Sequence, residues 1–113
     1  MDDCLFCKIV RGDLPSDTLW EDGDVRVFKD IRPKAPVHYL IVPKKHVESV
    51  AALGDADVDI PRVLIFAAKK TGEMLKLEGY KLVFNVGRKG GQVIDHIHLH
   101  ILGGWNAPSP LDI

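Results

Sequence analysis

The sequence predicts an α+β fold with a mainly antiparallel sheet of about five strands. Short apolar and β-branched runs separated by turn residues indicate the strands, and a single long segment carries apolar residues at helical spacing. No internal repeat or low-complexity tract interrupts the pattern. Because the chain has 113 residues, 46% of them hydrophobic and 27% charged, we expect one domain covering residues 1–113.

The first half of the chain predicts a short helix and three strands. Residues 4–11 form the helix, which Gly12 and Pro15 bring to an end. Thr18–Glu21 and Val25–Lys29 form a hairpin in which the Asp-Gly pair between them supplies the turn conformation. Val37–Val42 is a nearly continuous apolar run between two prolines, which favours an interior strand carrying His38 on one face.

The second half predicts the one long helix and two more strands. Asp59–Leu77 has apolar residues spaced three and four apart, with Pro61 in its first turn and Gly79 just beyond its end. Tyr80–Val86 and Val93–Leu102 then form strands, joined by a glycine-rich loop at residues 87–91.

Charge and hydropathy exclude several classes of partner. Fifteen basic and sixteen acidic residues give a net charge of −1, so we expect no binding to nucleic acid polymer or to a membrane surface. The longest apolar runs fall far short of the ~20 residues of a membrane span. The acidic start, Met1-Asp2-Asp3, is unlike a signal peptide. We therefore expect a cytoplasmic protein with reduced thiols, in which Cys4-x-x-Cys7 is a metal or redox pair.

Three histidines alternate with apolar residues in the last predicted strand. His96, His98 and His100 therefore share one face, opposite Ile97, Leu99 and Ile101. A solvent-exposed polar face is one interpretation. A metal triad is a second, although alternate residues lie ~6.6 Å apart and the outer pair spans ~13 Å, which makes three ligands to one ion awkward. The third is nucleophilic catalysis by one neutral imidazole, with its neighbours orienting it.

The loop before these histidines favours the third interpretation. Gly90-Gly91-Gln92 allows backbone amides to approach an anion closely, and Arg88 and Lys89 add positive charge. Phosphate is a natural occupant of such a loop.

In these motifs the sequence resembles the histidine-triad (HIT) superfamily, and within it the histidine-triad nucleotide-binding proteins. The resemblance runs from about Cys4 to Trp105. Its segments are Phe6-Cys7-Lys8-Ile9-Val10-Arg11-Gly12 with Pro15, Asp30-Ile31 with Pro33 and Pro36, His38-Tyr39-Leu40-Ile41-Val42-Pro43-Lys44-Lys45-His46, Asn85, Gly90-Gly91-Gln92 and residues 96–104.

The resemblance implies a hydrolase acting on purine nucleotides such as AMP or GMP derivatives. His98 would attack the α-phosphorus and form a nucleotidyl-histidine that water resolves. His100 would lie by the phosphate and leaving group, and His38 near the site, unless it is a hydrogen-bonded core histidine. Nucleoside phosphoramidates or adenylylated compounds are the implied substrates. The alternatives are dinucleoside polyphosphate hydrolysis, or a zinc-containing nucleotide-binding or partner-binding module with little turnover.

The resemblance also implies a nucleotide site. Asp30 would accept hydrogen bonds from the ribose hydroxyls. The expected base slot is formed by Phe6, Ile9, Phe28 and Ile31, although its apolar members would equally suit a plain core. The phosphate is expected at Asn85, Gly91 and Gln92. Several family members have a serine where this chain has Val93, so one hydroxyl donor is missing and only the backbone amide is left there.

Two further properties are implied by the resemblance. Many bacterial members have an N-terminal Cys-x-x-Cys that binds a structural zinc ion together with two histidines, which are here Cys4, Cys7, His46 and His96; two buried thiols are the alternative. The family also forms homodimers through the long helix and a strand next to it, giving a continuous sheet. The consecutive apolar residues 63–66 support burial of the helix on more than one side.

Overall fold

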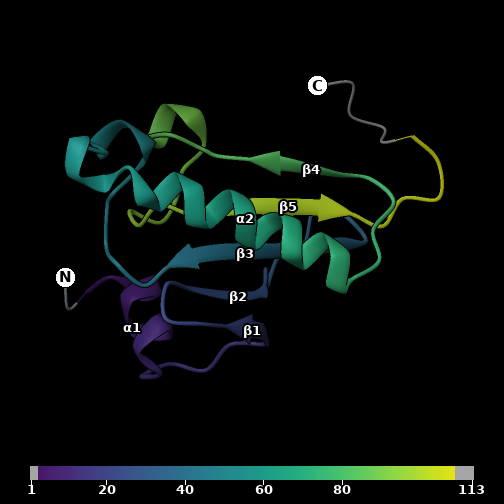
Figure 1. Cartoon of the computed structure of the whole chain (residues 1–113), viewed down its shortest axis with the longest axis horizontal. Helices are drawn as coiled ribbons and strands as arrows, with labels where there is room; N and C mark the ends of the chain where they lie inside the picture. The colour runs from purple at the N-terminus through teal and green to yellow at the C-terminus, as the bar shows by residue number, and fades with distance from the viewer. Residues whose placement is uncertain (1–2, 109–113) are drawn as a thin grey trace.

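The computed structural model describes residues 3–108, so the ends of the expected 1–113 domain lie outside the described residues. Its sheet has the strand order β1-β2-β3-β5-β4, and every neighbouring pair is antiparallel (Figure 1). The elements are α1 (Leu5–Arg11), β1 (Thr18–Glu21), β2 (Val25–Lys29), β3 (Val37–Pro43), α2 (Asp59–Met74), β4 (Tyr80–Val83) and β5 (Leu99–Gly103), with short 3-10 turns at Val50–Ala52, Asp55–Asp57 and Arg88–Gly90. The predicted α+β class and antiparallel sheet are confirmed.

The two faces of the sheet bury two separate apolar clusters. Helix α2 lies across β3 and β5 (Figure 1) and covers the cluster that contains Val27, Ile41 and Leu64. The alternate strand residues Phe28, Leu40 and Val42 face the other way and pack against Phe6, Ile9 and Val10 of α1. The period-two alternation of β2 and β3 therefore separates a face covered by α2 from a face covered by α1.

Helix α2 ends at Met74, three residues before the predicted end. Lys76 adopts the left-handed conformation with a φ of 55°. The backbone N–H of Leu77 donates to Gly72, and that of Lys76 donates to Glu73. These bonds form a helix-ending motif that glycine usually supplies, and the sequence signal at Gly79 pointed too far along the chain.

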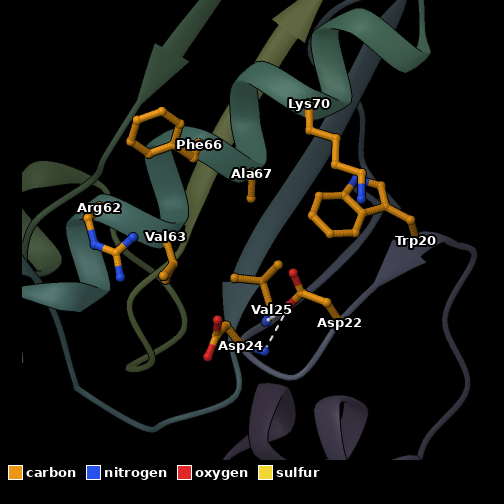
Figure 2. Close-up of a pocket in the computed structure, with 9 residues that line it drawn as sticks. All are labelled: Trp20, Asp22, Asp24, Val25, Arg62, Val63, Phe66, Ala67 and Lys70. Carbon is orange, nitrogen blue, oxygen red and sulfur yellow. Dashed lines mark hydrogen bonds between the residues drawn. The ribbon is translucent and has the colours of Figure 1, made fainter.

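The β1–β2 turn also differs in mechanism from the prediction. Gly23 is not among the residues with positive φ. The Asp22 carboxylate instead accepts the backbone N–H groups of Asp24 at 2.8 Å and Val25 at 2.9 Å (Figure 2). The turn therefore depends on an aspartate side chain rather than on the conformational freedom of glycine.

Both C-terminal strands are shorter than predicted. Strand β4 ends at Val83 rather than Val86, and β5 begins at Leu99 rather than Val93. Before Leu99 the partner strand reaches Pro43, which has no N–H to donate. The Pro43 carbonyl accepts the His96 ring N–H at 2.7 Å, and Ile97 donates instead to the Val47 carbonyl. Residues 96 and 97 are therefore fixed by hydrogen bonds that do not belong to the β3–β5 strand pairing.

A small cavity of about 190 Å³ lies between α2 and the β1–β2 turn. Trp20 and Lys70 face each other there, with the ammonium 4.0 Å from the ring centroid (Figure 2). The indole N–H donates to Thr71 Oγ1 at 3.0 Å, and the Thr71 hydroxyl donates to the Ala67 carbonyl. Among residues 3–108, no helix is long and apolar enough to cross a membrane.

Replacing Thr71 by valine should lower the free energy of unfolding by about 1–2 kcal/mol, because the indole N–H of Trp20 loses its acceptor. Urea denaturation measures the change. In a Trp20→Phe background the same replacement should cost less, since no donor is then left unpaired. Equal costs in the two backgrounds would mean that the hydrogen bond does not stabilise the contact between β1 and α2.

Candidate active site and metal centre

A cleft of about 710 Å³ opens on the α1 face of the sheet. Its volume is in the range of sites that bind small molecules. Most of the residues expected to contact a nucleotide line it. They are Phe6, Ile9, Phe28, Asp30, Ile31, His38, Asn85, Gly91, Val93, His98 and His100.

Strand pairing explains why the histidines meet in this cleft. His100 is the direct partner of Leu40 across the β3–β5 pair, and Leu40 points toward the α1 cluster. His38 lies two residues from Leu40, so it shares that face. His98 precedes β5, yet the chain still alternates there, because Ile97 and Leu99 are buried in the opposite cluster.

His98 is held in one tautomer. Its Nδ1 lies 2.7 Å from the His96 carbonyl oxygen. Because a carbonyl only accepts, Nδ1 carries the proton and Nε2 keeps its lone pair. The side chain is buried and packs edge-on against the Phe6 ring, with the centroids 5.0 Å apart. Burial lowers the pKa of His98, so the neutral imidazole is favoured.

His38 and His100 form a directional chain of hydrogen bonds. The backbone N–H of Lys34 donates to His38 Nδ1 at 3.0 Å, so the proton of neutral His38 is on Nε2. That Nε2 donates to His100 Nδ1 at 2.9 Å. An Asp30 carboxylate oxygen lies 3.4 Å from the same His38 Nε2. The proton of His100 is then on Nε2. Burial, with smaller contributions from His98 and His38, lowers the pKa of His100 to about 4.

The expected base slot is part of the α1-side apolar cluster. Phe6 and Phe28 make an edge-to-face contact with ring centroids 5.7 Å apart, and Ile9 is buried beside them. Ile31 is 92% exposed at the cleft rim. The Phe6, Ile9 and Phe28 side chains therefore serve the core and line the cleft together, which explains why their sequence pattern could not separate the two roles.

Gln92 differs from the expectation because its side chain is buried and turned away from the cleft. Its Oε1 accepts the Gly87 N–H at 2.9 Å, and its Nε2 donates to the carbonyls of Glu48 and Ile94. Gln92 thus holds the glycine-rich loop to the segment after β3. Asn85 Nδ2 donates to the Gly90 carbonyl at 2.9 Å and supports the same loop.

Arg88 also differs from its expected position beside a phosphate. Its guanidinium makes two hydrogen bonds to Asp95, at 2.7 and 2.9 Å, and one to the Gln92 carbonyl. Three other cationic side chains line the cleft instead: Lys29, Arg32 and Lys34. The sequence did not predict these residues as part of the site. Lys29 is the last residue of β2, Arg32 and Lys34 lie in the loop that follows, and no motif or periodicity distinguishes them.

A second cluster brings together the four expected metal ligands. Cys4 caps the N-terminus of α1, Cys7 lies within it, and His46 and His96 follow β3 and precede β5. Cys4 Sγ is 3.4 Å from His96 Nδ1, Cys7 Sγ is 3.3 Å from His46 Nδ1, and the two Nδ1 atoms are 3.1 Å apart. All four ligand atoms lie within 4.8 Å of one another.

These distances fit a tetrahedral ion. Zinc bonds of about 2.0–2.1 Å to nitrogen and 2.3 Å to sulfur place neighbouring ligand atoms about 3.3–3.8 Å apart. His96 Nε2 donates to the Pro43 carbonyl at 2.7 Å. The unprotonated Nδ1 of His96 therefore directs its lone pair toward the two cysteines. Burial raises the pKa of the Cys7 thiol, with Cys4 adding to the effect. Two thiols and two imidazoles, with Cys7 and His96 buried and Cys4 and His46 partly buried, are ligand types suited to a zinc ion.

An antiparallel sheet that presents alternating histidines beside a nucleotide-sized cleft defines the class of histidine-triad proteins. The HIT domain family model matches residues 11–107. The chain therefore belongs to the HIT domain family, as its motifs predicted.

Individual relatives agree with this membership. The chain is 40% identical over 111 residues to Protein HitA of Neisseria gonorrhoeae, covering 91% of this chain and 97% of that protein. A HIT family hydrolase from Legionella pneumophila, known from a crystal structure, is 44% identical in sequence to this chain. Its structure superposes with a TM-score of 0.88 over 96% of this chain and 98% of the other.

Two further structures have names that mention a ligand. A histidine triad nucleotide-binding protein from Candida albicans is 35% identical, with a TM-score of 0.78 over 95% of this chain and 85% of that one. A zinc-bound histidine triad family protein from Mycobacterium smegmatis is 31% identical, with a TM-score of 0.78 over 95% and 78% of the two chains.

Replacing Gln92 by alanine should lower the free energy of unfolding by about 1–3 kcal/mol, because three partly buried hydrogen bonds to backbone groups are lost with the buried side chain. Urea denaturation followed by circular dichroism measures this. The neighbouring Val93→Ala variant is the control, since Val93 is 76% exposed and its truncation should change stability by less than about 0.5 kcal/mol. Similar stabilities for the two variants would contradict the anchoring role of Gln92.

Proposed function

We propose that the protein is a nucleotidyl hydrolase that cleaves purine nucleoside phosphoramidates or related adenylylated compounds at the α-phosphate. The observation that carries this proposal is the orientation of His98. Its Nδ1–H donates a hydrogen bond to the His96 carbonyl, which leaves the Nε2 lone pair available as a nucleophile at the cleft. Membership of the HIT domain family and the similarity to a named hydrolase and a named nucleotide-binding protein support it.

The cleft suggests how a purine nucleotide such as AMP or GMP would bind. The apolar side chains of its lining, Phe6, Ile9, Phe28 and Ile31, would contact the base. The Asp30 carboxylate also lines the cleft, with one oxygen 3.4 Å from His38 Nε2, and would accept hydrogen bonds from the ribose hydroxyls. The phosphate would then lie against His98, His100 and the loop of Asn85, Gly91 and Val93. In this arrangement Gln92 acts indirectly, by holding the loop.

The reaction would proceed in two displacements. His98 Nε2 forms a bond to the α-phosphorus, the bond from phosphorus to the leaving group breaks, and the leaving group takes up a proton from solvent. The positive charge that develops on His98 is stabilised by the His96 carbonyl at Nδ1. Water then attacks phosphorus and loses a proton to solvent, the bond from phosphorus to His98 Nε2 breaks, and the nucleoside monophosphate is released with His98 neutral again. His100 Nε2–H, fixed by the bond from His38, would donate to the phosphate or the leaving group.

Specific observations favour two alternative functions. Arg32 and Lys34 line the cleft and would pair with the additional phosphates of a dinucleoside polyphosphate. Val93 lacks the hydroxyl that several family members have at this position, and losing one hydrogen bond to a charged group costs about 1.5–3 kcal/mol. A binding module with little turnover is therefore the second alternative.

Replacing His98 by alanine should abolish hydrolysis of an adenosine phosphoramidate while changing AMP affinity much less, because Asp30 and the apolar slot lie on other segments. Rapid quenching and mass spectrometry should detect a nucleotidyl adduct on His98 of the unaltered protein.

Parallel assays with a dinucleoside polyphosphate distinguish the two substrate classes. Turnover of neither compound by the unaltered protein, with AMP still bound, would support the binding module. Full activity in His98→Ala, or an adduct on His38 or His100, would contradict the assignment of the nucleophile.

We also propose that Cys4, Cys7, His46 and His96 hold one structural zinc ion per chain. Their spacing fits the ion, and a similar protein is named as zinc-bound. Bound zinc would crosslink the N-terminus of α1 to the segments around β3 and β5, and four protein ligands would leave no position for a reacting water. Because both thiols must stay reduced, we propose that the protein works in a reducing compartment such as the cytoplasm.

Protein purified without added metal should contain close to one zinc ion per chain by elemental analysis. Removing the ion with a chelator, or replacing Cys4 and Cys7 together by serine, should lower the melting temperature, since binding energy is lost from the folded state. A metal-free protein whose melting temperature is unchanged in the double serine variant would show that the cluster is only a pair of buried thiols.

A homodimer is the third part of the proposal. Strand β4 pairs only with β5 among the described strands, which leaves its outer edge unpaired. Tyr80, Leu82 and Val83 on β4, and Ile65 and Phe66 on α2, are exposed apolar side chains. A two-fold partner pairing along β4 would continue the sheet and cover these side chains.

Sedimentation at micromolar concentration should give a dimer. Ile65→Lys should shift it toward monomer, because a charge would be buried in the interface. Thr18→Lys, which adds the same charge on β1 at the opposite edge of the sheet, should leave the dimer intact. A monomer in the unaltered protein would exclude this interface.

A further inference from the structure

The charged and the apolar side chains that line the cleft come from different segments of the chain. Among the described residues, the acidic and basic members of the lining all lie between positions 17 and 34: Asp17, Lys29, Asp30, Arg32 and Lys34. The start of α1 and the two residues after Gln92 contribute Leu5, Val93 and Ile94 instead. We propose that these three apolar side chains form a subsite for the leaving group, so that the preferred substrates carry an apolar alkyl or aryl amine on the α-phosphorus. The subsite rests on the proposed function and names its substrate class.

Contacts of neighbouring residues bring the two segments together. Cys4 Sγ lies 3.4 Å from His96 Nδ1, which holds the start of α1 against residue 96. The His96 backbone N–H donates to the Ile94 carbonyl at 2.9 Å. Cys4 and Ile94 also pack against the same apolar cluster on the α1 side of the sheet. Leu5 follows Cys4 directly and Val93 precedes Ile94, so all three side chains of the subsite belong to segments that meet at one wall of the cleft.

This wall adjoins the proposed nucleophile. Phe6, the residue after Leu5, packs edge-on against the His98 ring with the centroids 5.0 Å apart. In the proposed function the phosphate lies between His98 and the loop that contains Val93. A substituent on that phosphorus would therefore lie within reach of the Val93 side chain.

The exposure of these side chains suits an apolar ligand. Val93 is 76% exposed and Leu5 is 41% exposed, although both line the cleft. An alkyl or aryl group that covered them would remove apolar surface from water on both sides of the contact. A serine hydroxyl at position 93 would instead have to give up water to an apolar group, which costs free energy. Valine at this position therefore favours an apolar substituent over a polar one.

The positive charges of the cleft lie beside other groups. The Lys34 ammonium donates to the Arg32 carbonyl at 2.9 Å. Burial lowers the pKa of His38 and His100, and the charge of Lys34 adds to both effects, which places that charge beside this pair. Residues 91–94 bring no charged side chain to the cleft. An anionic leaving group beside Val93 would therefore find no cationic partner in that segment.

Hydrolysis of an N-alkyl phosphoramidate breaks the phosphorus–nitrogen bond and leaves the alkyl group unchanged. His98 Nε2 bonds to phosphorus, and the nitrogen keeps the bonding pair, takes a proton from solvent and departs as the free amine. Water then displaces His98 from phosphorus and loses a proton to solvent. Because the alkyl group touches Val93 both before and during the reaction, the contact should lower KM and change kcat little.

Two adenosine phosphoramidates of matched size test the subsite, one with an N-butyl and one with an N-methoxyethyl group. In the unaltered protein kcat/KM should be about threefold or more higher for the butyl compound, through a lower KM. Val93→Ser and Val93→Ala should each lower the ratio of the two kcat/KM values about threefold, and Leu5→Ala should lower it as well. Comparing ratios between variants cancels the intrinsic reactivity of the two amines. Val58→Ser, at a 69% exposed valine outside the cleft lining, should keep the ratio.

Three results would overturn the subsite. The first is a ratio that is the same in the unaltered protein and in both variants of Val93. The second is a ratio that falls in Val93→Ser and not in Val93→Ala, because the cause would then be the added hydroxyl. The third is faster turnover of an N-carboxypropyl compound than of the butyl compound, which would show selection by the cations Arg32 and Lys34.

Binding of AMP esters separates the subsite from the proposed function. Butyl and methoxyethyl esters of AMP have poor alkoxide leaving groups, so calorimetry measures their affinity without turnover. The butyl ester should bind about threefold more tightly than the methoxyethyl ester, and Val93→Ser should remove this difference. Equal affinities in the unaltered protein would overturn the subsite even if phosphoramidates are hydrolysed. A preference for the butyl ester without hydrolysis of any phosphoramidate would count against the proposed function and support the subsite.

Discussion

The hydrogen bond from His96 Nε2 to the carbonyl of Pro43 supports both the candidate active site and the candidate metal centre. Pro43 has no N–H, and its carbonyl is used by an imidazole, so the regular pairing of β3 with the last strand cannot extend in this direction. The same bond fixes the other nitrogen of His96 toward the two cysteines. The His96 backbone, held in place by its side chain, then presents its carbonyl to His98.

The chemistry proposed for the cleft depends on histidines kept neutral and in defined tautomers. Burial lowers the pKa of His98, His38 and His100, so the uncharged rings are favoured. Each ring has one nitrogen whose role is set by a neighbour: the His96 carbonyl for His98, the Lys34 N–H for His38, and His38 for His100. Two backbone groups and one neutral imidazole thus give the free lone pair on His98 and the N–H on His100 that the proposed reaction requires.

The sequence was sufficient for the fold class because its strongest patterns are set by simple periodicities. The alternation of histidines with Ile97, Leu99 and Ile101 correctly predicts opposite faces, even though only part of that segment forms a strand. The failures have physical causes. The end of α2 is set by a left-handed lysine, and the β1–β2 turn by an aspartate side chain. The inward orientation of Gln92 depends on contacts with Glu48, 44 positions away, which no local pattern reveals.

The contact between Cys4 and His96 also bears on how the chain folds during synthesis. These residues are 92 positions apart in sequence. Strands β1, β2 and β3 can pair as soon as they leave the ribosome, because each is adjacent to the next in both sequence and space. The contact of the N-terminal helix with His96 can form only after residue 96 has emerged. Until then one face of the nascent sheet is incompletely covered, and a truncated chain would expose apolar surface that favours aggregation.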